Sequence, residues 1–193
     1  MIRLASEKDV PAMLAIYTPY VTDTTFSFEY TPPTPDEFLT RFRSISENFP
    51  WLVWEEDGRV LGYAYGSLPF ERAAYAWCGE VSIYLAPQVR GKGVGRRLYT
   101  ALEKLMLLQG YRVFYALVTS ENTVSLAFHE KLGYRPGVVF DRCGFKFGRW
   151  LGVHWLEKRP EIGEIPTRMP VPWRDIVESD EKKTGILDIL SLS

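Results

Sequence analysis

Hydrophobic and polar residues repeat along this chain with two different periods, and the changes between them divide the sequence into predicted strands and helices. Residues 1–5 read as a short strand. Ser6, with Asp9 three residues later, then forms a capping signature ahead of a helix whose apolar face is expected at Val10, Met13, Leu14 and Tyr17. A second helix is predicted after Thr34-Pro35, a capping residue followed by proline at the first helical position.

The middle of the chain predicts a hairpin and then alternating strands and helices. Two apolar runs within residues 51–68 meet at Asp57-Gly58, a dipeptide typical of tight hairpin turns. Strands are expected over residues 79–87 and 113–118, helices from Val94 to Gly110 and over residues 120–133, and antiparallel strands over residues 134–158. The order β-α-α-β-β-β-α-β-α-β-β predicts one mixed α/β sheet with helices on both faces.

The composition changes after residue 160. Prolines at positions 166, 170 and 172 precede the charged run "ESDEKK". We therefore predict a single domain over residues 1–160 and a C-terminal extension over residues 161–193. The extension is expected to lie along the surface, with about its last 15 residues mobile.

Charge and cysteine content exclude several classes of function. Lys plus Arg number 23 against 24 for Asp plus Glu, and this near balance argues against a nucleic-acid partner. The N-terminus has no signal-peptide pattern, and no apolar run approaches the roughly 20 residues that span a bilayer, so no membrane partner is expected. Two cysteines and two histidines without metal-site spacing predict no metal and a cytoplasmic location. Aromatic residues make up 15% of the chain, which suits a pocket with aromatic walls.

The stretch "QVRGKGVGRRLY", residues 88–99, predicts a phosphate-binding turn between a strand and a helix. Glycine lets the backbone approach a phosphate closely, and N–H groups at a helix start attract anions. The spacing G-x-G-x-G followed by Arg96-Arg97 excludes both the nucleoside-triphosphate loop and the dinucleotide fingerprint. The alternative is a glycine turn beside a solvated basic face.

The pattern Arg90-x-x-Gly93-x-Gly95, followed after one helix and one strand by "ENTVSLAFHEKLGY", resembles the GCN5-related N-acetyltransferase (GNAT) superfamily. The segments "TFSFEYTPPTPDEF", "AYAWCGEVSIYL" and "GFKFGRWLGVHW" are similar to its phosphinothricin acetyltransferase-like branch, which includes acetylases of methionine sulfone and sulfoximine. The resemblance covers residues 1 to about 158. It implies the GNAT fold, a mixed and mostly antiparallel sheet that splays between its fourth and fifth strands. It also implies acetyl-CoA as co-substrate and a homodimer paired across the late β segment.

The resemblance also implies which residues hold acetyl-CoA. The N–H groups of Val81 and Ile83 are expected to bind the pantetheine amides, and successive N–H groups from about Arg90 to Arg96 the diphosphate. The complete set of expected cofactor contacts is Val81, Ile83, Tyr84, Leu85, Arg90, Gly91, Lys92, Gly93, Val94, Gly95, Arg96, Asn122 and Ser125.

Amide formation requires a neutral amine, so a group must accept a proton. Glu80 aligns with the general base of this branch, and its neighbours Tyr75, Trp77 and Cys78 are apolar enough to raise its pKa by desolvation. The alternative is an acidic residue that faces water. His129 stands where many GNAT enzymes have tyrosine, and we expect it to protonate the leaving thiolate or to help deprotonate the amine. Alternatively it is structural, and water supplies the proton.

Substrate contacts are predicted in two groups. The aromatic residues Phe26, Phe28, Tyr75 and Trp77 are candidate pocket walls, with packing as the alternative. The cations Arg72, Lys146 and Arg149 are candidates for binding a carboxylate or phosphinate, with surface charge as the alternative. The sequence thus predicts an acetyl-CoA-dependent N-acetyltransferase for a small amino-acid-like amine. The alternatives are acetylation of another amine, such as a polyamine or a protein N-terminus, and a non-catalytic acyl-CoA-binding module.

Overall fold

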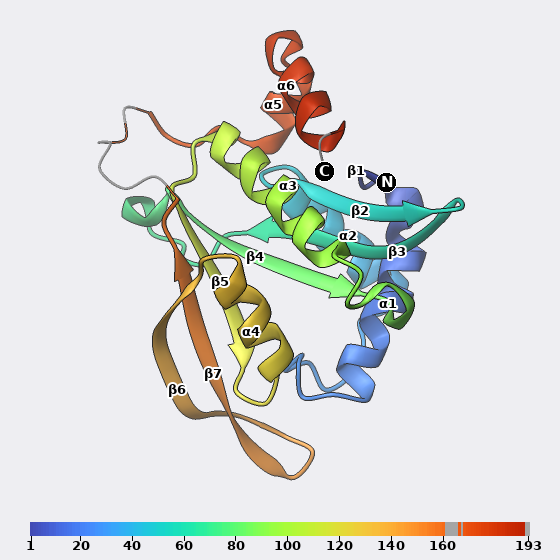
Figure 1. The fold of residues 1–193 in the computed structure, drawn as a ribbon, viewed down its shortest axis with the longest axis vertical. Helices are drawn as coiled ribbons and strands as arrows, with labels where there is room; N and C mark the ends of the chain where they lie inside the picture. The colour runs from blue at the N-terminus through green and yellow to red at the C-terminus, as the bar shows by residue number, and fades with distance from the viewer. Residues whose placement is uncertain (161–165, 167, 192–193) are drawn as a thin grey trace.

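The computed structural model describes residues 1–160, 166 and 168–191, and within these residues seven strands form one sheet (Figure 1). The spatial order is β1-β2-β3-β4-β5-β7-β6, and all neighbours are antiparallel except β4 and β5. The strands are β1 (Ile2–Leu4), β2 (Trp51–Glu56), β3 (Arg59–Ser67), β4 (Cys78–Leu85), β5 (Val113–Thr119), β6 (Arg135–Lys146) and β7 (Arg149–Lys158). The predicted fold class and the predicted order of elements through residue 158 are confirmed.

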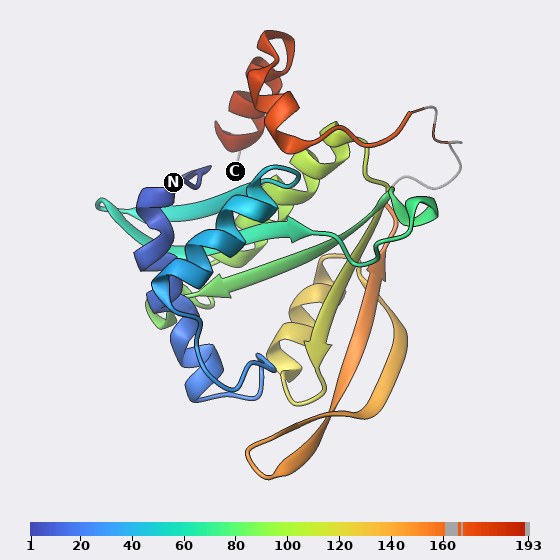
Figure 2. The same ribbon diagram turned by 180° about the vertical axis from the view of Figure 1, so that it is seen from behind.

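Helices cover both faces of the sheet. They are α1 (Val10–Thr22), α2 (Pro35–Ser46), α3 (Val94–Gln109), α4 (Thr123–Lys131), α5 (Trp173–Glu178) and α6 (Asp180–Ser191), with short 3-10 turns at Glu7–Asp9, Ala73–Tyr75 and Pro87–Val89. Helices α3 and α4 lie on one face, whereas α1 and α2 lie on the other (Figures 1 and 2). Because both faces are buried, β2 is apolar at successive positions: Leu52 and Trp54 pack toward α3, and Trp51 and Val53 pack toward α1 and α2.

The predicted caps and turns form as expected. Thr34 Oγ1 accepts the N–H of Glu37, whose carboxylate accepts the N–H of Thr34 in return. Asp57 and Gly58 both have positive φ, 49° and 72°, as a two-residue hairpin turn requires.

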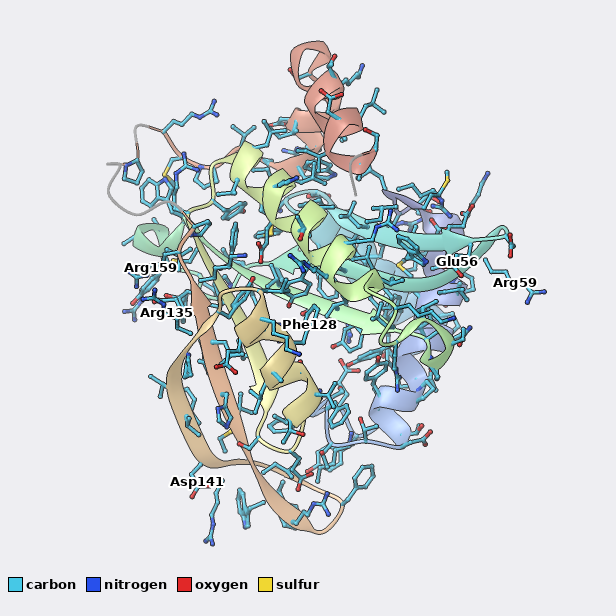
Figure 3. The ribbon with its side chains drawn as sticks, in the orientation of Figure 1. Glu56, Arg59, Phe128, Arg135, Asp141 and Arg159 are labelled. Atoms are coloured by element: carbon cyan, nitrogen blue, oxygen red, sulfur yellow. The ribbon has the colours of Figure 1, made fainter. Side chains whose placement is uncertain are left out.

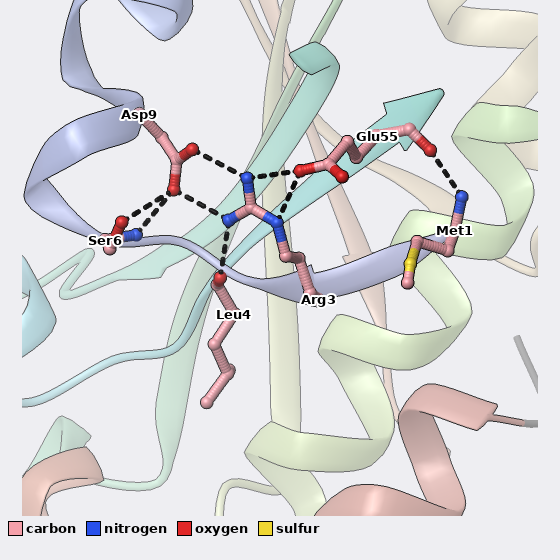
Figure 4. A network of polar contacts seen from close by, with 6 residues as sticks. All are labelled: Met1, Arg3, Leu4, Ser6, Asp9 and Glu55. Atoms are coloured by element: carbon pink, nitrogen blue, oxygen red, sulfur yellow. Dashed lines mark hydrogen bonds and ion pairs between the residues drawn. The ribbon is translucent and has the colours of Figure 1, made fainter. Parts of the chain in front are cut away.

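A polar network holds the N-terminal strand in place (Figure 4). The guanidinium of Arg3 donates to both carboxylate oxygens of Asp9, at 2.7 and 2.8 Å, and to the carboxylate of Glu55 at 2.8 Å. The hydrogen bond from Arg3 lowers the pKa of Asp9. The network therefore fastens β1 to β2 and to the start of α1.

The fourth and fifth strands pair over only three positions, Cys78–Val113, Gly79–Phe114 and Glu80–Tyr115. Beyond these positions the two strands diverge (Figure 1). This divergence confirms the predicted splay. Beyond it, the later residues of β4 and β5 form no backbone hydrogen bonds with one another.

The C-terminal segment differs from the expected surface tail. Residues 161–165, 167 and 192–193 of the predicted extension lie outside the described residues, but residues 173–178 and 180–191 form α5 and α6. Trp173, Ile176 and Ile186 are buried in the core cluster on the α3 face. The charged run "ESDEKK" led to the expectation of a surface tail. The apolar positions that flank this run lie on helix faces, and the helices pack against α3 and β1.

Candidate active site

The divergence of β4 and β5 opens a cleft through the sheet, reached from both of its faces. Its lining comes from α1, the loop after it, β4, α3, β5 and α4. The lining residues are Tyr20, Phe26, Val81, Ser82, Ile83, Tyr84, Tyr99, Ala116, Leu117, Val118, Thr119, Asn122, Ser125 and His129. Five of the thirteen predicted cofactor residues and one of the two predicted catalytic residues are therefore brought together here: Val81, Ile83, Tyr84, Asn122, Ser125 and His129.

One edge of the cleft presents backbone N–H groups of β4. The N–H of Ala86 donates to β3, whereas the N–H and carbonyl of Leu85 both bond the hydroxyl of Tyr20, at 3.0 and 2.8 Å. Because backbone groups point alternately to the two sides of a strand, the N–H groups of Ile83 and Val81 point the same way as that of Leu85, toward the cleft. Tyr20 thus occupies Leu85, and the last pairing of β4 with β5, at Glu80 and Tyr115, uses the N–H of Val81. Of these three groups, the N–H of Ile83 is left for a ligand.

The glycine turn follows β4, which lines the cleft, and lies immediately before α3. Gly91 and Gly93 have φ of 74° and 79°, a conformation that strains any residue with a Cβ. Within the described chain, no N–H group of residues 91–96 donates a hydrogen bond to another residue. Lys92 and Arg96 are exposed beside them. The turn therefore presents free N–H donors and positive charge, as an anion-binding site requires.

Arg90 and Gly95 have structural contacts in addition. Arg90 Nε donates to the carbonyl of Leu85 at 3.1 Å, and its guanidinium lies over the ring of Tyr20. A Cβ on Gly95 would lie 3.3 Å from the side chains of both Leu85 and Phe128. Phe128 projects from α4 on the side facing α3 (Figure 3). Glycine at position 95 thus permits close packing of α3 against β4 and α4, beyond any contact with a phosphate.

His129 lies on the cleft wall in a buried hydrogen-bonded network and is 3% exposed. Its Nδ1 lies 2.7 Å from the carbonyl of Ser125, which can only accept, so Nδ1 carries the proton. Its Nε2 lies 2.8 Å from the hydroxyl of Tyr99, which also lies 3.1 Å from the carbonyl of Val81. Burial lowers the pKa of His129, so the neutral ring accepts the Tyr99 proton at Nε2 near neutral pH.

Asn122 begins α4, as the sequence predicted. Its Oδ1 accepts the N–H of Ser125 at 3.1 Å. No partner for its side-chain NH2 group is found among the described residues. Asn122 therefore both starts the helix and keeps two donors for a ligand in the cleft.

Glu80 occupies the position where β4 and β5 separate. Tyr84 packs with α1 and α2, so Glu80, four residues earlier on the strand, lies on that same face of the sheet. Within the described residues, no hydrogen bond or ion pair reaches its carboxylate, and burial raises its pKa. The direction of the pKa shift anticipated from the sequence is present, although the indole of Trp77 faces the C-terminal segment.

An aromatic cluster lies next to Glu80 on the face that the described helices leave uncovered (Figure 2). Tyr115 is the strand partner of Glu80, and its ring lies 5.8 Å from those of Phe70 and Trp155. The ring of Tyr75 packs at a tilt against that of Phe70, with centroids 4.6 Å apart, and Tyr75 is 44% exposed. The predicted contact residue Tyr75 therefore belongs to an accessible aromatic surface close to the carboxylate.

Three other predicted substrate residues lie elsewhere. The indole N–H of Trp77 donates to the carbonyl of Arg168 at 3.0 Å, so this side chain faces the C-terminal segment. Lys146 is buried, with its ammonium bonded to three carbonyls, and has no donor left for a carboxylate. Phe28 packs against Gly144 of β6. Packing accounts for Phe28, as its alternative allowed. Lys146 fits neither of its two expected roles, because it is buried on backbone carbonyls and is not a surface charge. Arg72 is exposed ahead of the turn at Ala73–Tyr75.

A comparison with protein-family models identifies an acetyltransferase (GNAT) domain over residues 2–155. The chain is 37% identical over 165 residues to phosphinothricin N-acetyltransferase of Alcaligenes faecalis, covering 84% of each chain. The chain belongs to the GNAT acetyltransferase family.

Other GNAT relatives differ in their named substrates. L-methionine sulfoximine/L-methionine sulfone acetyltransferase of Pseudomonas aeruginosa is 37% identical over 163 residues, covering 81% of this chain and 92% of the relative. The crystal structure of a phosphinothricin acetyltransferase from Sinorhizobium meliloti in complex with AcCoA superposes with a TM-score of 0.84 at 33% identity. That superposition covers 90% of this chain and 96% of the neighbour. The predicted family and its branch are thereby confirmed.

Several residues of this GNAT site carried no recognisable signal in the sequence. Tyr20, Tyr99 and Thr119 reach the cleft from three separate elements, so their convergence depends on tertiary structure alone. The hydroxyl of Thr119 is notable, because the residue is 5% exposed and its Oγ1 finds no hydrogen-bond partner in the described chain.

Two other kinds of site were sought among the described residues. No group of three or more His, Cys, Asp or Glu side chains has the proximity needed to bind a metal ion. None of the helices there is both long enough and apolar enough to cross a bilayer.

Proposed function

We propose that this GNAT protein is an acetyl-CoA-dependent N-acetyltransferase that acetylates the free amine of a small amino-acid-like substrate. Phosphinothricin, methionine sulfone and methionine sulfoximine represent the substrate type. One observation carries the proposal: β4 runs from a partly buried carboxylate without a described partner, along the wall of the cleft, to a turn with free N–H donors.

The residues of the cleft fit the chemistry of acetyl-CoA, which supplies an activated acetyl group as a thioester. The free N–H groups of residues 91–96 suit the diphosphate, with Lys92 and Arg96 adding charge. The N–H group of Ile83 suits an amide of the pantetheine chain. The unpartnered Thr119 hydroxyl and the Asn122 amide supply further polar groups within reach of that chain.

Glu80 acts in this proposal as the base that accepts a proton from the amine. An ammonium has a pKa near ~10 and is no nucleophile, so proton removal must precede attack. Burial without a partner makes the Glu80 carboxylate more basic than an exposed one, because nothing else stabilises its charge. The aromatic surface around Tyr115 lies beside the carboxylate on the same face of the sheet.

His129 acts through Tyr99 rather than alone. Burial raises the pKa of Tyr99 well above its ordinary value, so the phenol stays protonated, and its single proton must turn from His129 Nε2 and the Val81 carbonyl to reach a ligand in the cleft. The neutral ring of His129 holds this hydroxyl at Nε2, while Ser125 fixes the ring through Nδ1. The pair is proposed to supply the proton that the departing thiolate requires.

A homodimer in the cytoplasm is also proposed. The resemblance implies pairing across the late β segment, and β6 and β7 there expose large apolar side chains: Val138, Val139, Phe140, Phe145 and Trp150. Burial of such a surface stabilises association. Cys78 and Cys143 are both free, which suits a reducing compartment.

The decisive experiment measures thiol release from acetyl-CoA against a panel of amines. We expect turnover with phosphinothricin, methionine sulfone or methionine sulfoximine, and little with polyamines or peptides. Calorimetry with CoA runs in parallel. CoA binding without acetylation of any amine would support the acyl-CoA-binding module instead, and no CoA binding would refute both readings.

A further inference from the structure

Lys146 joins the end of β6 to the loop that follows α1. It is 2% exposed, and its Nζ donates to the carbonyls of Val21 at 2.7 Å, Thr24 at 3.0 Å and Ser27 at 2.7 Å. An ammonium has three donors and no acceptor, so these contacts saturate it.

Burying the Lys146 ammonium has a free-energy cost that the contact must offset. Removing an ammonium from water is costly, and within the described residues no carboxylate lies within ion-pair distance of Lys146. Three carbonyl dipoles compensate for the lost hydration only when the loop adopts this one conformation. The contact is therefore better suited to fixing the loop than to adding net stability.

Further contacts fasten the same loop to its surroundings. The hydroxyl of Tyr30 donates to the carbonyl of Phe145, next to Lys146 on the strand. Phe28 lies so close to Gly144 that a Cβ there would stand 2.2 Å from its ring. The β6–β7 hairpin thus holds the loop through a charge, a hydroxyl and an aromatic contact.

A third element holds the loop near its middle. Thr25 Oγ1 donates to the carboxylate of Glu121, which also accepts from Arg149 of β7, each at 2.8 Å. This bridge links the loop to the β5–α4 connection as well as to the hairpin, so its position is determined from two directions.

The loop carries one wall of the cleft. Phe26 lies between the loop positions that Lys146 holds, and Tyr20 lies just before them. Both line the cleft, together with Ser82 and Tyr84, whose positions on β4 place them on the same face as Glu80. This is the amine side of the cleft in the proposed function.

We propose that Lys146 is a positioning residue that holds residues 21–27 as the wall of the amine site and thereby determines which amines fit. The inference rests on the proposed function. It changes the role expected of Lys146 from direct binding of substrate to control of a neighbouring wall.

The test compares Lys146→Met with Lys146→Arg, using methionine sulfone and phosphinothricin as amines. Lys146→Met keeps the length of the side chain and removes all three donors. We expect its KM for the amine to rise at least tenfold and its KM for acetyl-CoA to stay within twofold of the native value. Lys146→Arg keeps charge and donors and should recover part of the loss.

Gln109→Met is the matched control. Gln109 is also fully buried, and its Nε2 donates to two backbone carbonyls, of Asn48 and Val171, away from the cleft. We expect this variant to lose thermal stability with an unchanged KM for the amine. A merely structural role for Lys146 would give the same pattern in Lys146→Met, and that result would overturn the proposal.

Hydrogen exchange gives a readout that does not depend on activity. Backbone amides of residues 21–30 should exchange faster in Lys146→Met than in the native protein, and should not do so in Gln109→Met. Unchanged exchange in Lys146→Met would show that Lys146 does not hold this loop. If the native enzyme acetylates neither amine, the proposed function fails while this measurement still decides the role of Lys146. Should Lys146→Met not fold, Gly144→Ala provides a second test, because its added Cβ pushes Phe28, and with it the loop, away from β6. The proposal then requires that Gly144→Ala raise the KM for the amine.

Discussion

Replacing Glu80 by glutamine tests the proton-accepting role at the point where β4 and β5 separate. Glutamine has the same shape but does not accept the proton of an ammonium at neutral pH. A positioned general base contributes typically 10²–10⁴-fold to rate. Because the Glu80 carboxylate is partly buried without any described hydrogen-bond partner, no such partner lowers its basicity, and we expect the upper part of this range. A loss of 10³–10⁴-fold in kcat corresponds to roughly 4–5 kcal/mol of transition-state stabilisation.

The assay is thiol release under saturating acetyl-CoA, with kcat/KM for the amine measured between pH 5 and 9. In the native enzyme, kcat/KM should rise with pH as Glu80 loses its proton, at a pH above the ordinary value of 4.5 because burial raises the pKa. In Glu80→Gln this step should vanish, leaving only the titration of the amine. Native-like activity in the variant at every pH would show that another group is the base.

The same substitution has a consequence for stability that opposes its effect on activity. Since the pKa of Glu80 is higher in the folded state, the fold binds its proton more tightly than the unfolded chain does. Stability is therefore lost as pH rises from 4.5 through the raised pKa. Glu80→Gln should melt at a higher temperature than the native protein at pH 8, and this advantage should disappear below pH 4.5. A lower melting temperature at pH 8 would mean that the carboxylate is stabilised by a partner.

Three further predictions concern the cofactor cleft and the C-terminal segment. Gly93→Ala places a Cβ at a residue with positive φ and should weaken CoA binding, measured by calorimetry, at least tenfold. The control is Gly58→Ala in the β2–β3 turn, which carries a similar backbone strain of roughly 1–2 kcal/mol. The Gly58→Ala protein should bind CoA with native affinity. Thr119→Val should raise the Kd for CoA about five- to tenfold, about 1 kcal/mol, without loss of stability; an unchanged Kd would remove Thr119 from the cofactor site. Trp173→Ala should lower the free energy of unfolding in urea by about 3–5 kcal/mol, and the exposed Arg174→Ala should not; equal effects would show that α5 is not part of the core.

Much of the fold could be predicted because its signals are local. The caps at Ser6 and Thr34, the turn at Asp57-Gly58 and the helix stop at Gly110 each depend on residues only a few positions apart. The glycine turn before α3 belongs to the same class, since its positive φ angles and free N–H groups arise within six residues.

The individual side-chain assignments were less predictable. Lys146 and Trp77 were reasonable candidates for substrate contact, yet their polar atoms bond to backbone carbonyls distant in the sequence. Tyr99 and Thr119 gave no signal, because a hydroxyl on a predicted helix or strand does not reveal what it faces.

The sequence by itself determined the order of strands and helices through residue 158, the glycine turn before α3 and the family, because periodicity, capping and short motifs act over a few residues. Only the tertiary structure decided which groups meet in the cleft, that a buried ammonium holds its wall, and that α5 and α6 pack against the main core. Those outcomes depend on contacts between residues up to 125 positions apart, such as Lys146 with Val21, whose free energy belongs to the folded chain and to no segment alone.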